Sequence, residues 1–596
     1  MKNVSTPRSR ESVVGSRKIK EMNSDKTHST SPVSPTCQNC KKPFTIEPAD
    51  FGFYEHINVP PPTFCPDCRF GRRLLFWNAV NLYKRTCDLC KNFHISTYPP
   101  EAPYKVYCAK CWWSDKWDPR DYGREYDFSR PFFEQLDELW HEVPLLGMSQ
   151  DLMTQETCPY SHDAGHLRNC YLIFHAESTE DSACGFFVGY SQNIFDSSAI
   201  EQSQSLYDCM HCYRANRCIG IRHQLSESID CLFCRDCQNC QNCFASANLK
   251  NKKYYAWNKP LSKEEYFKEI AKYDLGSYRT YKDLQAKTEE FWKTQMPKSE
   301  YNEFVTNCTG PNIFHSKNVK DGIEVYQTED SRYVFRMWGP NNNCYDISMF
   351  GINFSNSYEG VVVGGDADRL LFCREAGLNA TDIRYSTLST GGNHHFGCVS
   401  MKKGDHVILN RMYPKEEYEK MAAAIREQMD KMPYADARGC VYKYGEFFPP
   451  ELSPFAYNTT LAQNFFPLSR TETAEKKYAW RDEEVEEHEP TLKAGDIPDH
   501  IKDAPDSIVN ERIACLECGR PYRIIKMELD FHRQMNVPLP RECPQCRIDA
   551  KLTRWAGDNR RIPRVCAGCG KSMESKYLES EAPKVFCKKC YQAAII

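Results

Sequence analysis

Residues 177–248 divide into six blocks of equal length: ESTEDSACGFFV (from Glu177), GYSQNIFDSSAI (from Gly189), EQSQSLYDCMHC (from Glu201), YRANRCIGIRHQ (from Tyr213), LSESIDCLFCRD (from Leu225) and CQNCQNCFASAN (from Cys237). Each block opens with polar residues and continues into a short apolar or cysteine-bearing run that is typical of a β-strand. Short units of fixed length with Asn, Asp, Ser and Gly at their corners predict a parallel β-solenoid. An antiparallel sheet of short hairpins is the alternative, and one coil comprises either one block or two.

The second half of the chain carries a similar, nearly constant rhythm, at Asp330, Asn343, Asn356, Asp368, Thr381, Asn393 and Asp405. A longer duplication relates the two halves, because residues 248–270 align without gaps with residues 400–422 at an offset of 152. Each copy ends in a glutamate-rich amphipathic stretch that predicts a helix. Ser262 is placed to cap the first of these helices with Glu265 in a capping box, and Pro414 suits the first turn of the second.

Cysteine pairs of the form C-x-x-C occur four times near each end of the chain. Their spacing is the same in both sets: the interval from Cys40 to Cys65 equals that from Cys518 to Cys543, and the interval from Cys90 to Cys108 equals that from Cys569 to Cys587. Two such pairs complete a closed tetrahedral shell of four thiolates, which is the structural type of zinc site. The sequence therefore predicts about four zinc ions. The predicted ligands are Cys37, Cys40, Cys65, Cys68, Cys87, Cys90, Cys108, Cys111, Cys515, Cys518, Cys543, Cys546, Cys566, Cys569, Cys587 and Cys590.

The stretches around the first two pairs of each set, CQNCKKPFTIEPADFGFYEHINVPPPTFCPDCRFGRR at 37–73 and CLECGRPYRIIKMELDFHRQMNVPLPRECPQCRIDAK at 515–551, resemble the probable zinc-ribbon domain family. Both stretches carry the C-x-x-C pairs, which we call knuckles, the proline and the C-x-x-C-R ending. Phe531-His532 stands in the second stretch where the first has Phe53-Tyr54. The resemblance implies zinc binding and no settled biochemical role. The larger plan resembles uncharacterised cysteine-rich bacterial proteins.

These patterns predict a multidomain, mainly β protein in which treble-clef or zinc-ribbon-like modules flank a duplicated β-solenoid with helical connectors. The expected divisions are a disordered basic tail (1–36), an N-terminal double zinc module (37–124), a helical connector (125–157), a first solenoid repeat (158–260), a helical segment (261–307), a second solenoid repeat (308–411), a helix (412–432), an irregular linker with an acidic run (433–504) and a C-terminal double zinc module (505–596).

Composition places the chain in a reducing compartment. Its 596 residues contain 32 cysteines and carry a net charge of only −3. The tail lacks the apolar core of a secretory signal, and no apolar run is long enough to span a bilayer, so we expect a cytoplasmic protein without a membrane partner. The cysteines are then metal ligands or reduced thiols rather than a disulfide framework, which would return as the interpretation if the protein were exported by another route.

Basic and aromatic residues follow the second cysteine pair of each set. Residues 511–590 hold 17 Lys and Arg against 10 Asp and Glu, and residues 37–111 hold 10 against 6. Such a local excess with interleaved aromatics suits nucleic-acid contact, although a solubilising surface explains it as well. The candidate contact residues are Arg69, Arg72, Arg73, Lys84, Arg85, Arg547, Lys551, Arg554, Arg560, Arg561 and Arg564.

The run CLFCRDCQNCQNC places a cysteine at every third position from Cys231 to Cys243. Because residues three apart on one strand face opposite ways, buried apolar packing is the first interpretation, and a further zinc site or an iron–sulfur cluster are the alternatives. His211 and the His394-His395 pair are expected to be hydrogen-bonded corner residues. Asp366 and Asp368 resemble the carboxylates of polysaccharide-cleaving β-helices.

The preferred hypothesis is a non-enzymatic zinc-binding scaffold or adaptor that binds nucleic acid (RNA or DNA) or a protein partner through its zinc modules. The symmetry of duplicated ends around a duplicated middle favours it, and no small-molecule substrate is indicated. A carbohydrate-binding or carbohydrate-active β-helix is one alternative. A metal-buffering or thiol-redox protein is the other.

Overall fold

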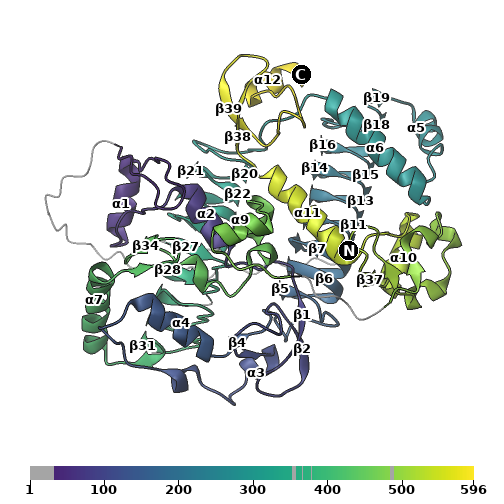
Figure 1. The fold of residues 1–596 in the computed structure, drawn as a ribbon. Helices are drawn as coiled ribbons and strands as arrows, with labels where there is room; N and C mark the ends of the chain where they lie inside the picture. The colour runs from purple at the N-terminus through teal and green to yellow at the C-terminus, as the bar shows by residue number, and fades with distance from the viewer. Residues whose placement is uncertain (1–31, 352–356, 366, 378, 483–488, 596) are drawn as a thin grey trace, which may run out of the picture.

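The computed structural model describes residues 32–351, 357–365, 367–377, 379–482 and 489–595. Most of the tail (1–31), the centre of the acidic run, Asn356 and Asp366 therefore lie outside the described residues. The chain is mainly β, with two large sheets of parallel strands and cysteine clusters near both ends (Figure 1).

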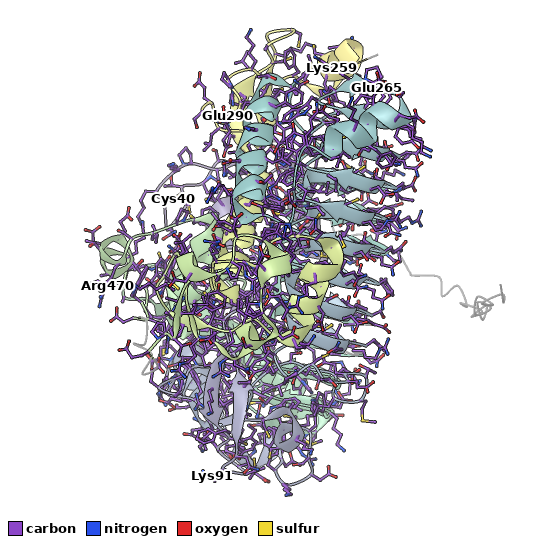
Figure 2. The ribbon with its side chains drawn as sticks, turned by 90° about the vertical axis from the view of Figure 1, so that its right-hand side faces the viewer. Cys40, Lys91, Lys259, Glu265, Glu290 and Arg470 are labelled. Carbon is purple, nitrogen blue, oxygen red and sulfur yellow. The ribbon has the colours of Figure 1, made fainter. Side chains whose placement is uncertain are left out.

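The first repeat (158–260) forms the larger sheet, of 15 strands. All neighbours in it pair in parallel except the last two. Figure 2 shows these short strands stacked one above another along the long axis of the molecule. The strands are β5 (His162–Gly165), β6 (Arg168–Glu177), β7 (Glu180–Phe186), β8 (Val188–Gly189), β9 (Gln192–Phe195), β10 (Ser198–Glu201), β11 (Gln204–Tyr207), β12 (Met210–Tyr213), β13 (Asn216–Ile219), β14 (Arg222–Ser226), β15 (Ile229–Leu232), β16 (Arg235–Gln238), β17 (Gln241–Phe244), β18 (Lys253–Ala256) and β19 (Lys259–Pro260).

The second repeat (308–411) forms a sheet of 10 strands and a smaller one of three, β21-β23-β25. Its strands are β20 (Ile313–Phe314), β21 (Lys317–Lys320), β22 (Ile323–Tyr326), β23 (Thr328–Arg332), β24 (Phe335–Trp338), β25 (Asn341–Asn342), β26 (Ile347–Gly351), β27 (Tyr358–Val361), β28 (Asp368–Arg374), β29 (Thr381–Arg384), β30 (Asn393–Phe396), β31 (Asp405–Ile408) and β32 (Arg411–Met412).

The spacing of the sequence blocks is the spacing of the paired strands. Gln192 of β9 lies opposite Gln204 of β11, which lies opposite Asn216 of β13, so each strand pairs with its counterpart in the next block. In the second repeat Asp368 pairs with Thr381, and Thr381 pairs with Asn393, as the predicted rhythm requires. The pairing is parallel, so the alternative of antiparallel hairpins is wrong.

Left-handed residues turn the chain at almost every third position of both repeats. In one stretch of the first repeat these are Phe233, Asp236, Asn239 and Asn242, with φ between 48° and 57°. Asn and Asp tolerate this conformation better than other non-glycine residues. Short strands therefore alternate with corners, and the residues at every third position between the corners point to the inside of the stack.

The longer duplication is visible in matched hydrogen bonds. The side-chain oxygen of Asn258 accepts from Ala247 N at 2.8 Å, and that of its counterpart Asn410 accepts from Val399 N at 2.9 Å. A helix follows each: α5 (Lys263–Ile270) and α7 (Lys415–Lys431). The predicted capping box of Ser262 is present, whereas Pro414 is the N-cap of α7 and precedes its first turn.

The remaining helices connect and cover the repeats. The predicted helical connector (125–157) contains α4 (Phe132–Glu142), and the predicted helical segment (261–307) contains α5 and α6 (Tyr278–Thr294). Two short helices, α8 (Leu461–Phe465) and α9 (Arg470–Glu475), lie in the predicted linker. The N-terminal module (37–124) contains α1 (Pro48–His56), α2 (Pro66–Leu74) and α3 (Ala109–Trp112). The C-terminal module (505–596) contains α10 (Lys526–Met535), α11 (Pro544–Asp558) and α12 (Lys588–Ile595).

Three buried clusters show how these parts join. The interiors of the first and second repeats form separate apolar clusters, and the first is rich in cysteine. A third, larger cluster runs from Cys37 to Trp555 and combines side chains of both modules with those on the outer faces of both repeats. The modules are therefore packed against the sheets, as the positions of α2 and α11 in Figure 1 show.

Candidate metal centres

All four predicted cysteine sets are assembled, and they share one backbone design. In each first knuckle the residue after the second cysteine is left-handed: Lys41, Lys91, Gly519 and Gly570. Its amide donates to the carbonyl of the first cysteine at 2.9 to 3.1 Å. In each second knuckle the amide of the first cysteine donates to a sulfur of the first knuckle at 3.1 to 3.3 Å, as from Cys65 N to Cys37 Sγ.

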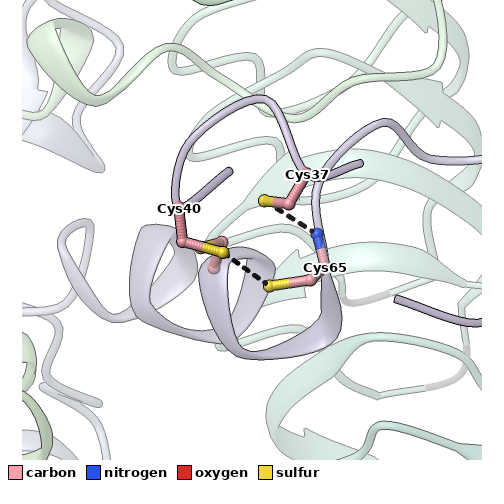
Figure 3. Close-up of side chains that lie close together, drawn as sticks. Cys37, Cys40 and Cys65 are labelled. Atoms are coloured by element: carbon pink, nitrogen blue, oxygen red, sulfur yellow. Dashed lines mark hydrogen bonds between the residues drawn. The ribbon is translucent and has the colours of Figure 1, made fainter. Parts of the chain in front are cut away.

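The sulfur atoms lie at distances that suit one ion. Cys40 and Cys65 are 3.7 Å apart (Figure 3), Cys518 and Cys543 3.8 Å, and Cys569 and Cys587 3.9 Å. A tetrahedral shell with metal–sulfur bonds of about 2.3 Å has edges of about 3.8 Å. Each set of four thiols thus has the size of a four-thiolate metal site, and all four sets are groups that could hold a metal ion.

The surroundings of these thiols act in both directions, because burial raises the pKa of several of them, that of Cys543 to about 11, while helix N-termini and backbone hydrogen bonds oppose this shift. Cys65, Cys108 and Cys543 are the N-caps of α2, α3 and α11, where the helix dipole favours negative charge. A hydrogen bond from the backbone at Asn92 is the main cause that lowers the pKa of Cys90 to about 7. A backbone hydrogen bond from Cys587 likewise lowers the pKa of Cys566 to about 6. The donor set and its hydrogen bonds fit a thiophilic ion.

The N-terminal module docks on the second repeat through buried ion pairs. Arg69 donates to both oxygens of Asp346 at 3.0 Å, and Arg73 donates to the same carboxylate at 2.9 Å. Arg72 donates to Glu359 at 2.5 Å. These side chains are no more than 3% exposed. Burial raises the pKa of Glu359 to about 7 even though the Arg72 guanidinium opposes this shift.

The C-terminal module docks on the first repeat in the same way. Arg547, at the position equivalent to Arg69, donates to both oxygens of Asp196 at 2.6 Å. Lys551, equivalent to Arg73, donates to Asp208. Arg222 of the first repeat joins them at 2.9 Å from Asp208 and helps to hold the pKa of that carboxyl well below its usual range despite burial. These ion pairs therefore join each module to the repeat that is farther from it along the chain, although Trp555 of the C-terminal module also donates to Glu324 of the second repeat.

An aromatic contact accompanies each of these ion pairs. Phe53 stacks on Tyr345 with ring centroids 3.7 Å apart, and Phe531 stacks on Phe195 at 3.9 Å. Tyr345 and Phe195 directly precede the acceptor carboxylates Asp346 and Asp196 in the sequence. The two interfaces are thus built from equivalent residues.

Burial removes five of the predicted nucleic-acid contacts from solvent. Arg69, Arg72, Arg73, Arg547 and Lys551 are at most 10% exposed and are paired with carboxylates. A guanidinium that is enclosed and already neutralised cannot reach a phosphate, so in this fold these five side chains join the modules to the repeats instead.

Of the other six basic candidates, Arg85 is also buried, and the remaining five lie nearer the surface. Arg85 and Arg564 are equivalent and donate to backbone carbonyls within their own modules, including Tyr104 O and Tyr577 O. Arg554, Arg560 and Arg561 pair with Glu289, Glu581 and Glu574. Lys84 is exposed and lies over the ring of Phe93 at 4.7 Å. Nucleic-acid contact by these residues remains a prediction.

The other sequence candidates lie in or on the repeats. The five cysteines from Cys231 to Cys243 are at most 2% exposed, inside the first repeat. His395 is also interior, whereas His211 lies 3.5 Å from Asp558. Asp368 pairs with Arg369 at 2.8 Å.

Two groups of residues at these sites were not predicted from the sequence. The first group consists of the acceptor carboxylates Asp196, Asp208, Asp346 and Glu359. A sequence pattern could have indicated them, because each directly follows an aromatic residue and the two in each repeat occupy corresponding positions in successive blocks. The second group is His394, Asp405 and His406, whose side chains could hold a metal ion. His394 is bonded to Asp405 at 2.7 Å and stacks on His406.

No family model, curated protein or solved structure matches this chain. The resemblance to the probable zinc-ribbon family therefore stays a prediction. No helix among the described residues combines the length and the apolar character needed to cross a bilayer.

Proposed function

We propose that this chain is a non-enzymatic scaffold in which two zinc-binding, zinc-ribbon-like modules clamp a two-part β-solenoid. The crossed docking of the modules carries this proposal. Each module uses its basic residues and its aromatic side chain to hold the distant repeat, which is the task of a structural clamp. Four thiolates fill a tetrahedral shell and leave no position for a water or a substrate, so the zinc ions stabilise structure.

The parallel pairing of successive blocks supports a solenoid with one block per coil. In such a stack each coil satisfies the backbone of the next, and the ends need covering. The second half of the C-terminal module contacts both repeats, since Arg561 pairs with Asp321 of the second repeat at 2.6 Å and the hydroxyl of Tyr591 donates to Asn248 of the first. The clamp therefore acts on both repeats at once.

Metal analysis and solution scattering of the purified full chain test this proposal. We expect zinc at four or more ions per chain. Removing the zinc with a chelator should increase the radius of gyration as the modules undock, while the β signal in circular dichroism persists. Zinc below four per chain, or modules that stay docked after complete removal, would contradict the clamp.

The outer rims of the modules favour a protein over a nucleic acid as the partner. Phe93, Val565 and Leu516 are 71%, 62% and 61% exposed, next to or within the knuckles, and most of the nearby basic residues are already paired. A mobility-shift assay at low salt, where phosphate contacts are strongest, separates the two partner classes. We expect no shift with single- or double-stranded nucleic acid. A salt-sensitive shift that Lys84→Ala weakens would establish the nucleic-acid scaffold instead.

A further inference from the structure

One coil of the first repeat has cysteine at all four of its inward positions. The left-handed corners at Phe233, Asp236 and Asn239 turn the chain after every third residue, so Cys231, Cys234, Cys237 and Cys240 face the same interior. This corrects the expectation that residues three apart face opposite ways, which holds on a continuous strand and not around corners. The four side chains are 0, 0, 1 and 2% exposed.

The four thiols line the coil as a ring in which successive members contact one another, and Cys243 of the next coil links the two ends. Cys234 is in hydrogen-bonding contact with Cys231 on one side and Cys237 on the other, and Cys237 is in contact with Cys240. The sulfur of Cys231 lies 3.8 Å from the carbonyl oxygen of Cys240, across the start and end of the coil. Cys243, directly above Cys231 in the next coil, contacts both Cys231 and Cys240.

The neighbouring coils are filled differently. The coil containing Leu206 places that leucine and Ala215 beside two cysteines, Cys209 and Cys212, all of them buried. The coil directly below the ring sets Leu225 opposite Cys237. A branched aliphatic side chain is thus the usual filling of the interior, and the ring of thiols lacks one.

A buried positive charge lies on the same coil. Arg235 is 6% exposed, between Cys234 and Cys237 in the chain. Its ion pair with Asp236 measures 3.4 Å, and its Nη2 has no hydrogen-bond partner among the described residues. This charge interacts with Asp236 and with the rings of Tyr301 and Tyr577 rather than with the sulfur atoms, so the thiols must lose their protons to the binding of the metal ion itself.

We propose that Cys231, Cys234, Cys237 and Cys240 are the ligands of a fifth metal site, enclosed inside the first repeat, that takes a thiophilic ion of the Zn²⁺ class. Thiolate-only ligand sets select such soft or borderline ions. Each thiol loses its proton to solvent when the ion binds, and no oxidant or reductant takes part. The site does not depend on the four terminal sites, and it must be filled as the coil forms because the interior is closed.

Metal analysis of the full chain and of the double variant Cys237→Ser/Cys240→Ser tests the site. We expect five ions in the wild type and four in the variant. Cys209→Ser/Cys212→Ser is the matched control, because these two cysteines are equally buried in the same repeat but share their coil with Leu206 and Ala215. The control should retain five ions. Circular dichroism shows whether each variant keeps its β structure.

Two further measurements distinguish a metal-bound ring from one that holds free thiols or disulfides. A chelator should remove four ions quickly, through the exposed knuckle cysteines, and the fifth ion slowly. When Cd²⁺ is loaded in place of Zn²⁺, the thiolate absorption band should be about one fifth weaker in the double variant than in the wild type. Four ions in a folded wild type, unchanged by the double substitution, would overturn the proposal. So would a loss of four titratable thiols in the denatured wild type, which would show two disulfides across the coil.

Discussion

Replacing Asp346 by Asn tests whether buried ion pairs hold the N-terminal module on the second repeat. The Asp346 carboxylate is fully buried and is the shared acceptor of Arg69 and Arg73. The substitution keeps the volume but leaves two buried guanidinium groups without their counter-charge. Breaking a buried pair in this way costs about 3 to 5 kcal/mol. At about 1.4 kcal/mol per tenfold change, the opening equilibrium of the module should rise by roughly two to nearly four orders of magnitude.

Hydrogen exchange measured by mass spectrometry resolves this effect, because it reports the opening of one region of a large chain. The amides of α1 and α2 should lose protection, while those of the first repeat keep theirs. Glu138→Gln is the control, since the Glu138–Arg130 pair is 48% and 39% exposed and should contribute less than about 1 kcal/mol. If Asp346→Asn costs no more protection than Glu138→Gln, the docking does not depend on these charges.

Three further substitutions test other parts of the structure. Cys543→Ser should lower the metal count by about one and unfold the C-terminal module while the repeats survive, since zinc supplies on the order of 10 kcal/mol to such a module; an unchanged count would place the metal elsewhere. Burial lowers the pKa of His532 to about 4, so the folded state holds a neutral imidazole and should lose stability as the pH falls from about 6.5 towards 4. His532→Gln should flatten that loss relative to wild type in urea titrations at pH 7 and pH 5, and an identical pH dependence would contradict it. Ser262→Ala should cost about 1 kcal/mol in the local stability of α5, read by hydrogen exchange, and no change would mean that the cap contributes nothing.

Local patterns in the sequence predicted much of the fold. The repeat length of the blocks equals the offset at which the parallel strands pair, and the C-x-x-C spacing correctly predicted which cysteines form each of the four sets. Asn258 and Asn410, which the duplication aligns, make the same bond. Each of these features depends on residues that are close in sequence or that repeat at a fixed interval.

The partners of the basic residues could not be predicted, because they are set by contacts between residues far apart in the sequence. Arg69 and Asp346 are 277 residues apart, and a charged residue looks the same in sequence whether it faces solvent or a buried carboxylate. The predicted burial of the interior cysteines is confirmed, but their geometry differs from the expected one. Their spacing was interpreted on a continuous strand, whereas left-handed Asp236 and Asn239 turn the chain at each interval.

The crossed docking gives a physical reason for the metal ions that we propose in the modules. During synthesis the N-terminal module is complete long before Asp346 and Glu359 of the second repeat exist, so it must fold without its docking surface. A module of this size has too small a core to do so unaided, and the zinc that we propose for it would supply the missing stability. The C-terminal module is made last, when Asp196 and Asp208 of the first repeat are already in place. Zinc is therefore most needed by the N-terminal module, and metal depletion during synthesis should cost that module its fold before it affects the C-terminal one.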